Sequence, residues 1–379
     1  MRRILNIAFG ITALTAVLVA QAAVVKPTPP DVKARAYILQ DFDSGKVLVE
    51  VNADESLEPA SLTKMMTVYV TLAQLADGKF QIDDPVRISE KAWKMGGSKM
   101  FIEVGKEVPV EDLLKGVIIQ SGNDASVALA EFVAGDETAF ADLMNQYASQ
   151  LGMANTHFVN ASGLPHGDHY STARDMATLA VALIRDFPVH YPLHAVRTYT
   201  WNNIKQYNRN PLLTRDDSVD GVKTGHTESA GYCLVASAKQ DGMRLVSSLL
   251  GSKSEGSRLT ETQGLLRYGF RFFETNRLYE GGAVVTKARV WQGESEELEL
   301  GISDDLYVTV PRGQIKKLDI GMSVEEQILA PVSAGQALGV VRVSLDGEAI
   351  ADRPLLALNE VAVGSLWRRM SDYVKLWFE

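Results

Sequence analysis

Hydrophobic and polar positions repeat with two different periods in residues 36–275, and these periods predict both strands and helices. Short alternating runs predict strands at 36–39, 46–51, 232–239 and 243–250. Apolar residues at helical spacing predict helices at 65–76, 110–120, 125–134, 136–151, 173–187 and 259–273. Asp43-Ser44-Gly45 and Asp241-Gly242 are hairpin turn signals, and Asp220-Gly221 is also expected to be a turn. The predicted class is therefore α+β, with an antiparallel sheet beside a helical cluster.

The pattern changes after about Asn276, where helical periods vanish. Short alternating runs separated by Gly and Asp turns predict a small all-β domain over 276–363. The final segment, 364–379, is predicted to be an amphipathic helix. Its apolar side would carry Leu366, Trp367, Met370, Tyr373, Val374, Trp377 and Phe378, and its polar side Arg368, Asp372, Lys375 and Glu379. Aromatic and cationic residues together favour a membrane-surface helix, with packing back on the β domain as the alternative.

The N-terminus has the pattern of an export signal. Arg2-Arg3 precede the mostly apolar stretch 4–19, and Ala20-Gln21-Ala22 fits a cleavage site. The expected division is a signal peptide over 1–22, a mixed helix-and-sheet domain over 23–275, the β domain over 276–363 and the terminal helix over 364–379. An uncleaved anchor is the alternative for the first segment, and either reading exports the protein.

Composition narrows the partners and cofactors. The net charge of −9 argues against nucleic acid as the main partner. The single cysteine, Cys233, lies in an apolar strand pattern and is expected to be buried and inert. No His-Glu-x-x-His motif is present among the six histidines, and His166 and His169 are expected in a solvated loop. Neither a metal ion nor another cofactor is therefore expected.

Candidate chemistry begins at Ser61-Leu62-Thr63-Lys64, which opens a predicted helix. A spacing of three residues puts Ser61 and Lys64 on one face, where a neutral lysine can activate the hydroxyl. This motif alone is weak. Two further motifs follow in order, namely Ser121-Gly122-Asn123 in a tight connection between helices and Lys223-Thr224-Gly225 at the start of a strand. Together the three motifs are typical of penicillin-binding proteins and serine β-lactamases.

The residue types suggest a role for the first two motifs. Ser61 is the expected nucleophile and Lys64 its base, provided that burial or a second cation, Lys223, lowers the lysine pKa. Ser121 could relay a proton to the leaving nitrogen. The Asn123 amide could hold the substrate backbone and orient Lys64.

The third motif suggests a substrate-binding strand. Lys223 and Thr224 can bind a carboxylate by charge and by hydroxyl. Gly225 would let the substrate approach the backbone, because a Cβ there would intrude. Each of these residues also has an ordinary structural explanation, and only the set of three motifs outweighs it.

On these motifs the chain resembles low-molecular-mass penicillin-binding proteins of the D-alanyl-D-alanine carboxypeptidase type, close to the penicillin-binding protein 5/6 group. The resemblance implies a β-lactamase/transpeptidase-like catalytic domain. It also implies an oxyanion hole from the backbone N–H groups of Ser61 and His226. Arg258 is similar to the family arginine that helps to hold the terminal carboxylate of the substrate.

Three alternatives remain beside carboxypeptidase activity. A class A β-lactamase needs a carboxylate that activates water, but loop 158–168 has no glutamate and Gly122 stands where that class has aspartate. A D,D-endopeptidase would use the same catalytic residues. A non-catalytic cell-wall scaffold would leave the serine site vestigial.

The sequence therefore predicts an exported serine D,D-carboxypeptidase. Its substrates would be peptidoglycan stem peptides ending in D-Ala-D-Ala, and β-lactams would acylate Ser61. Residues 365–379 would hold the enzyme on the periplasmic face of the inner membrane.

Overall fold

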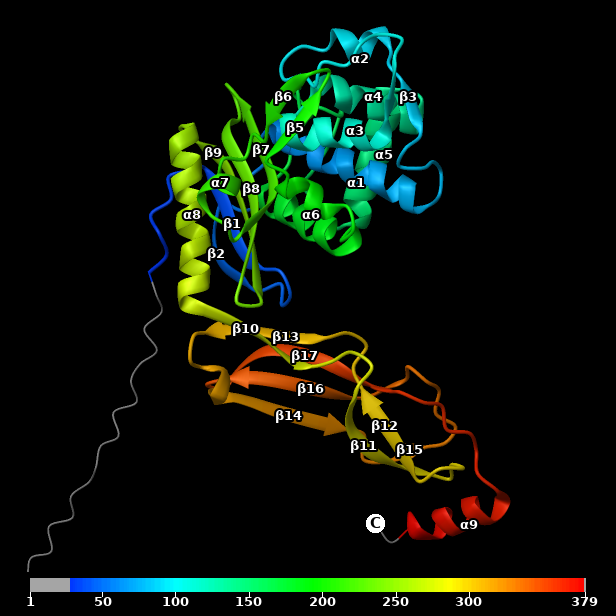
Figure 1. The fold of residues 1–379 in the computed structure, drawn as a ribbon. Coiled ribbons are helices and arrows are strands. Elements are labelled where there is room, and N and C mark those ends of the chain that lie inside the picture. The colour runs from blue at the N-terminus through cyan, green and yellow to red at the C-terminus, as the bar shows by residue number, and fades with distance from the viewer. Residues whose placement is uncertain (1–27, 378–379) are drawn as a thin grey trace, which may run out of the picture.

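The structure is a computed structural model that describes residues 28–377. The predicted signal peptide, Phe378 and Glu379 therefore lie outside the described residues. Figure 1 shows two bodies, a mixed body of helices and sheet above and an all-β body below. The predicted α+β class is confirmed.

A five-stranded antiparallel sheet forms the centre of the upper body. Its strands, in spatial order, are β2 (Val47–Val51), β1 (Ala36–Asp41), β9 (Met243–Ser252), β8 (Gly231–Gln240) and β7 (Val219–Thr227). The β8–β9 hairpin pairs Gln240 with Met243 across Asp241-Gly242, where both turn residues have positive φ. The hairpin predictions are confirmed, because the sequence placed turn residues where this left-handed backbone occurs.

Helices cover both faces of this sheet (Figure 1). Helix α8 (Glu255–Phe272) lies on one face against β8 and β9, and the other helices gather on the opposite side. These are α1 (Lys64–Ala76), α2 (Glu90–Lys94), α3 (Val110–Lys115), α4 (Asn123–Ala134), α5 (Glu137–Gln150) and α6 (Ala173–Asp186), with the short α7 (Leu212–Arg215) nearer the strands. Apolar side chains of α1, α4 and α6 are buried inside the helical cluster, and α6 also packs against β9.

Two features depart from the predicted elements. A hairpin joins β5 (Thr198–Trp201) to β6 (Ile204–Tyr207), and β3 (Pro85–Arg87) pairs antiparallel with β4 (Glu107–Pro109) across an intervening segment that contains α2. The turn predicted at Asp220-Gly221 is wrong, because both residues lie inside β7, next to a shift in its pairing with β8. A Cβ on Gly221 would lie 2.5 Å from Tyr191 Oη, so glycine is needed here for close packing.

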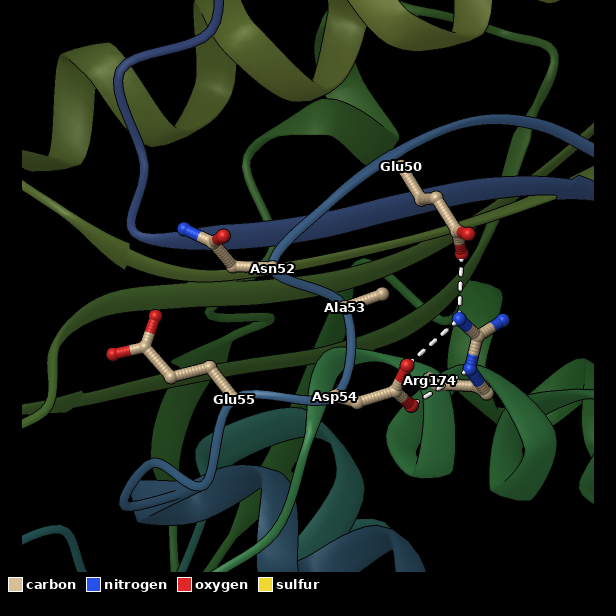
Figure 2. A pocket seen from close by; sticks show the side chains of 6 residues that line it. All are labelled: Glu50, Asn52, Ala53, Asp54, Glu55 and Arg174. Carbon is tan, nitrogen blue, oxygen red and sulfur yellow. Dashed lines mark hydrogen bonds and ion pairs between the residues drawn. The ribbon is translucent and has the colours of Figure 1, made fainter.

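A surface hollow beside β2 is lined by charged residues (Figure 2). Arg174, near the start of α6, forms ion pairs with Glu50 at 2.7 Å and Asp54 at 2.8 Å. Its backbone N–H also donates to Ala53 O at 3.0 Å. These bonds connect α6 to the end of β2, and the two carboxylates already balance the charge of Arg174. We therefore assign the residues of this hollow a structural role and no ligand.

The lower body is built mainly from strands, with one short 3₁₀ turn at Ile315–Lys317. A six-stranded sheet contains β14 (Leu318–Val324), β16 (Ala337–Leu345), β17 (Glu348–Ala357), β12 (Glu297–Gly301), β11 (Val284–Trp291) and β15 (Ile328–Leu329), and a two-stranded sheet contains β10 (Phe273–Tyr279) and β13 (Leu306–Pro311). Buried aliphatic side chains from both sheets form one core. Helix α8 runs directly into β10, so the two bodies are joined without a linker.

Hydrogen bonds also cross between the two bodies. The buried Asp41 carboxylate accepts from Thr275 Oγ1 at 2.7 Å. Ser44 Oγ lies 2.6 Å from Thr309 Oγ1, and Arg312 Nη2 donates to Phe270 O at 2.7 Å. Because Asp41 and Ser44 belong to the β1–β2 hairpin, that hairpin contacts both β10 and β13.

Helix α9 (Leu366–Lys375) lies at the end of the β body farthest from the upper body (Figure 1). Its apolar residues face solvent, and Trp367 is 83 % exposed. Its one buried side chain is Asp372, which accepts from the backbone N–H of Gln292 at 2.8 Å. Helix α9 thus contacts the β body through its polar side. Within residues 28–377, no helix combines the length and the apolar character needed to cross a membrane.

Candidate active site

The three motifs meet in one cleft of about 270 Å³. The turn before α1 supplies the first motif, the connection before α4 the second and strand β7 the third. The cleft is lined by Ser61, Ser98, Ser121, Arg209, Thr224, Gly225, His226, Tyr232, Glu255 and Arg258. Residues separated by more than 150 positions in the chain are thus brought to one place by the sheet and the helical cluster.

Ser61 and Lys64 have the geometry that their spacing predicts. Ser61 lies in a short 3₁₀ turn, Ala60–Thr63, that leads into α1. Lys64 is completely buried, and its Nζ lies 3.1 Å from Ser61 Oγ. The same amine donates to the carbonyl oxygen of Ser162 at 2.5 Å. The lysine is therefore held between the serine hydroxyl and one backbone acceptor.

Burial changes the protonation of Lys64. Desolvation lowers the pKa of its amine to about 7, and the charge of Asp124 partly opposes this shift. A substantial fraction of the amine is therefore neutral near pH 7, as a base requires. Of the two causes considered from the sequence, burial is the one that lowers this pKa.

Ser121 and Lys223 form a second pair across the cleft. Ser121 has φ +63°, a left-handed conformation at the end of a π-helical segment, Gly116–Gln120. Lys223 Nζ donates to Ser121 Oγ and to Thr224 O, each at 2.9 Å. Burial lowers the pKa of Lys223 well below its usual value, and the cations Lys64, Arg258 and Arg209 lower it further. The left-handed backbone of Ser121 is strained for a residue other than glycine, and such strain is common at functional sites.

Asn123 organises the rim of the cleft. Its Nδ2 donates to Gly96 O at 2.7 Å, and its backbone N–H donates to Ser98 O at 2.7 Å. The rim segment 95–99 is therefore fastened to the second motif. The carbonyl that holds Lys64 belongs to Ser162, so the expected role of Asn123 in orienting Lys64 stays a prediction.

Gly225 is required because β7 packs against the turn Ala60–Thr63, called the nucleophile turn below because it carries Ser61, the proposed nucleophile. A Cβ on Gly225 would lie 3.0 Å from Pro59 O and 3.2 Å from Ser61 N. The expectation was that the missing side chain makes room for substrate. In the structure, its Cβ position faces the 59–61 backbone, so glycine lets β7 lie against the turn that carries Ser61.

His226 and Arg258 both line the cleft. The exposed His226 ring lies over Tyr232, with the ring centres 4.0 Å apart. Arg258 is buried, and its Nη1 donates to Gly225 O and Cys233 O at 3.3 Å each. Its guanidinium thus connects β7 with β8 beside the third motif. Cys233 is buried as predicted, and burial raises its pKa to about 11.

Sequence reasoning missed several residues at the site. Asp124 is buried and accepts the backbone N–H groups of Met100 and Phe101, at 2.9 Å each. The sequence signal that could have identified Asp124 is an acidic residue directly after the second motif, at the start of an apolar helical run. Arg209 and Ser162 lie in irregular segments where no periodicity marks them. The prediction that His169 is solvated is wrong, because its side chain is 2 % exposed.

Comparison with known proteins identifies the family of this chain. Residues 23–254 match the family described as D-alanyl-D-alanine carboxypeptidase, and residues 273–363 match the penicillin-binding protein 5 C-terminal domain. The chain is 45 % identical to D-alanyl-D-alanine carboxypeptidase DacA of Escherichia coli K12, over 93 % of this chain and 89 % of the relative. It is 47 % identical to D-alanyl-D-alanine carboxypeptidase DacC of the same strain, over 92 % of this chain and 89 % of the relative.

A solved structure agrees as well. Penicillin-binding protein 5 of Haemophilus influenzae superposes with a TM-score of 0.86 at 42 % identity, covering 89 % of this chain and 99 % of that one. Fold, both domain families and whole-chain identity thus agree. The chain therefore belongs to the D-alanyl-D-alanine carboxypeptidase family and is a serine-type carboxypeptidase with a penicillin-binding protein 5 C-terminal domain.

Proposed function

We propose that Ser61 attacks the carbonyl between the last two D-alanine residues of a peptidoglycan pentapeptide, with Lys64 as the base. The observation that carries this proposal is the buried Lys64 amine, whose pKa is lowered to about 7 and which lies 3.1 Å from Ser61 Oγ. The serine proton moves to Lys64 Nζ as the new C–O bond forms.

The leaving D-alanine then needs a proton. Ser121 relays to its nitrogen the proton that Lys64 has taken up, and the C–N bond breaks to leave an acyl-enzyme on Ser61. Lys223, at 2.9 Å from Ser121 Oγ, holds that hydroxyl in place. Water hydrolyses the ester in the second half of the reaction and restores free Ser61.

Binding of the substrate uses the positive side of the cleft. Lys223, Thr224 and Arg258 bind the terminal carboxylate, and Asn123 holds the peptide backbone. The backbone N–H groups of Ser61 and His226 stabilise the tetrahedral oxyanion. Arg209 lines the same cleft and adds positive charge beside Arg258. β-Lactams acylate Ser61 because their cyclic amide takes the place of the D-Ala-D-Ala bond.

The direct test is release of D-alanine from diacetyl-lysyl-D-alanyl-D-alanine by the purified protein. We expect release by the wild type, none by Ser61→Ala, and a loss of at least about 10³-fold for Lys64→Ala, since nucleophile and base act as a unit. Fluorescent penicillin should label the wild type rapidly and Lys64→Ala slowly. Rapid labelling without D-alanine release would favour endopeptidase activity or a scaffold, and rapid labelling of Lys64→Ala would disprove the base.

We further propose that the protein is exported and held on the periplasmic face of the inner membrane by residues 365–379. Exposed Leu366 and Trp367 on the apolar side of α9, and exposed Trp377 beyond its last residue, support this location. Deleting 366–379 should abolish flotation with vesicles containing anionic lipid and leave activity on the small peptide unchanged. Continued flotation of the truncated protein would disprove the anchor.

A further inference from the structure

We propose that His169 is a positioning residue for the reaction: its hydrogen bond to Thr63 holds the Ser162 carbonyl against the Lys64 amine. The inference rests on the proposed role of Lys64 as base. His169 lies on loop 158–171, which passes behind the nucleophile turn. It is not among the residues that line the cleft, so we expect its effect on catalysis to act through Thr63 and this loop.

The hydrogen bonds of His169 define its tautomer. Its Nδ1 accepts from the backbone N–H of Val159 at 3.2 Å, and its Nε2 lies 2.7 Å from Thr63 Oγ1. Because a backbone N–H can only donate, Nδ1 must be bare and Nε2 must carry the hydrogen. Nε2–H therefore donates to the Thr63 hydroxyl. A neutral imidazole is the form that fits both partners.

The surroundings of His169 keep it neutral. The ring is buried and stands edge-on to Phe158 at 5.7 Å. Burial, with the nearby charges of His157, His166 and Lys64, lowers the pKa of His169 to about 4. The hydrogen-bonded arrangement is therefore stable over the pH range in which Lys64 titrates.

Thr63 connects this histidine to the reacting groups. It precedes Lys64 directly and is fully buried in the turn that carries Ser61. Loop 158–171 touches the same turn, since a Cβ on Gly163 would lie 1.8 Å from Ala60 O and 2.8 Å from Thr63 Oγ1. No side chain larger than hydrogen fits there, so loop and turn are in direct contact.

Ser162, next to Gly163, contributes the acceptor for Lys64 Nζ at 2.5 Å. One turn further along α1, Thr67 Oγ1 donates to Ala161 O at 2.7 Å. When the neutral amine donates a hydrogen to Ser162 O, its lone pair is free to accept the proton of Ser61. A loop that shifts away from Thr63 would leave the amine without this orientation and slow proton transfer.

The test separates the two hydrogen bonds of the imidazole. Glutamine at 169 extends its Nε2 to the position of the imidazole Nε2 and keeps a donor for Thr63. Asparagine at 169 places its Oδ1 near the position of Nδ1 and keeps only the acceptor for Val159. Thr63→Val removes the acceptor hydroxyl without changing side-chain shape, Thr63→Ser restores it, and His166→Asn is the control on the exposed part of the same loop.

The measurement is the second-order rate of Ser61 acylation by fluorescent penicillin, with the unfolding midpoint of each variant measured in parallel. We expect His169→Asn and Thr63→Val each to lower the rate by about tenfold, the usual effect of losing one orienting hydrogen bond. The double variant should be no slower than either single variant. His169→Gln and Thr63→Ser should stay within about threefold of the wild type, and His166→Asn should be unchanged.

Three results would overturn the inference. The first is a folded His169→Asn variant that is acylated at the wild-type rate, and the second is an equal loss of acylation rate in His169→Gln and His169→Asn. The third is a double variant whose loss of acylation rate is the product of the two single losses. A fall in unfolding midpoint with unchanged acylation would mean a purely structural histidine. Should His169→Asn not fold, the comparison of Thr63→Val with Thr63→Ser decides. Rapid acylation of Lys64→Ala would instead disprove the proposed base, whatever His169 does.

Discussion

Among single residues, the chemistry of this site depends most on the burial of Lys64, which sets the pKa of its amine. A lysine in water is protonated near pH 7, and here complete burial lowers the pKa to about 7. The carboxylate of Asp124 acts in the opposite direction and keeps the pKa from falling further. Asp124 also fixes the segment at Met100 and Phe101 beside the cleft rim. One buried carboxylate thus affects both the base and the loop next to it.

Asp124→Asn should separate these two effects. Because the rate of acylation follows the neutral fraction of Lys64, it should rise with pH through about 7 in the wild type and then level off. Removing the negative charge lowers the Lys64 pKa, so the rise should move to lower pH. Loss of a carboxylate acceptor should also cost about 1–3 kcal/mol of unfolding free energy.

Acylation rates measured against pH, together with urea unfolding at one pH, check both expectations. Glu131→Gln, on the last turn of the same helix, is the matched control. If the acylation rate of Asp124→Asn rose over the same pH range as that of the wild type, the electrostatic role of Asp124 would be contradicted.

At the scale of elements, α9 shows how one helix can serve two surfaces. Asp372 attaches its polar side to the Gln292 backbone, and Arg368 pairs with Glu296 at 2.9 Å. The apolar side stays free. An attached helix has a defined direction relative to the β body, whereas a free helix would be only a tether. Under the proposed membrane location, this attachment would hold the enzyme at a defined angle to the membrane.

Asp372→Ala should release α9 from the β body while preserving its apolar side. Trypsin should then cleave at Arg368 and Arg369 several-fold faster, because detached segments are cut through local opening. Flotation with vesicles should persist. Ser371→Ala, at a neighbouring exposed position, is the control, and unchanged cleavage of Asp372→Ala would show that Asp372 does not hold the helix.

At the scale of the whole molecule, the sheet, the helical cluster and the β body are connected through buried polar groups. His194 is one of them, since its Nδ1–H donates to Val222 O at 3.1 Å and its ring stacks on Tyr191. Burial lowers the pKa of His194 to about 4. In the unfolded chain the same group has a pKa of about 6.5. The folded protein therefore loses stability in acid as the unfolded chain takes up this proton.

The sign and size of this effect can be tested. Between about pH 6.5 and pH 4 the unfolded state binds more protons, so the free energy of unfolding should fall as pH falls, by up to about 3 kcal/mol from His194. His194→Asn keeps a donor for Val222 O and cannot titrate. Its unfolding free energy by urea should decrease less than that of the wild type between roughly pH 7.5 and 4.5. Equal decreases would contradict a neutral, buried His194.

Much of the fold was predictable from local patterns. The hairpins of β1–β2 and β8–β9 and the helices α1, α4, α5, α6 and α8 occur near their predicted positions, because their apolar residues repeat on one face. The β5–β6 hairpin was missed because its residues are largely polar or exposed. The wrong turn at Asp220-Gly221 has a different cause: glycine there accommodates Tyr191 and not a bend.

The candidate reacting groups are recognisable in the sequence, because the proposed nucleophile, the lysines and the hydroxyls occur in three ordered motifs with spacings set by one helix, one connection and one strand. Their properties depend on the tertiary fold. Burial lowers the Lys64 pKa, the Ser162 carbonyl orients its amine, and Gly225 admits the nucleophile turn. These effects depend on desolvation and on contacts between residues far apart in the chain, which a local pattern cannot encode. His169 is the clearest example, since its sequence context indicates solvent, whereas it is buried and bonded to Thr63, 106 positions away in the chain.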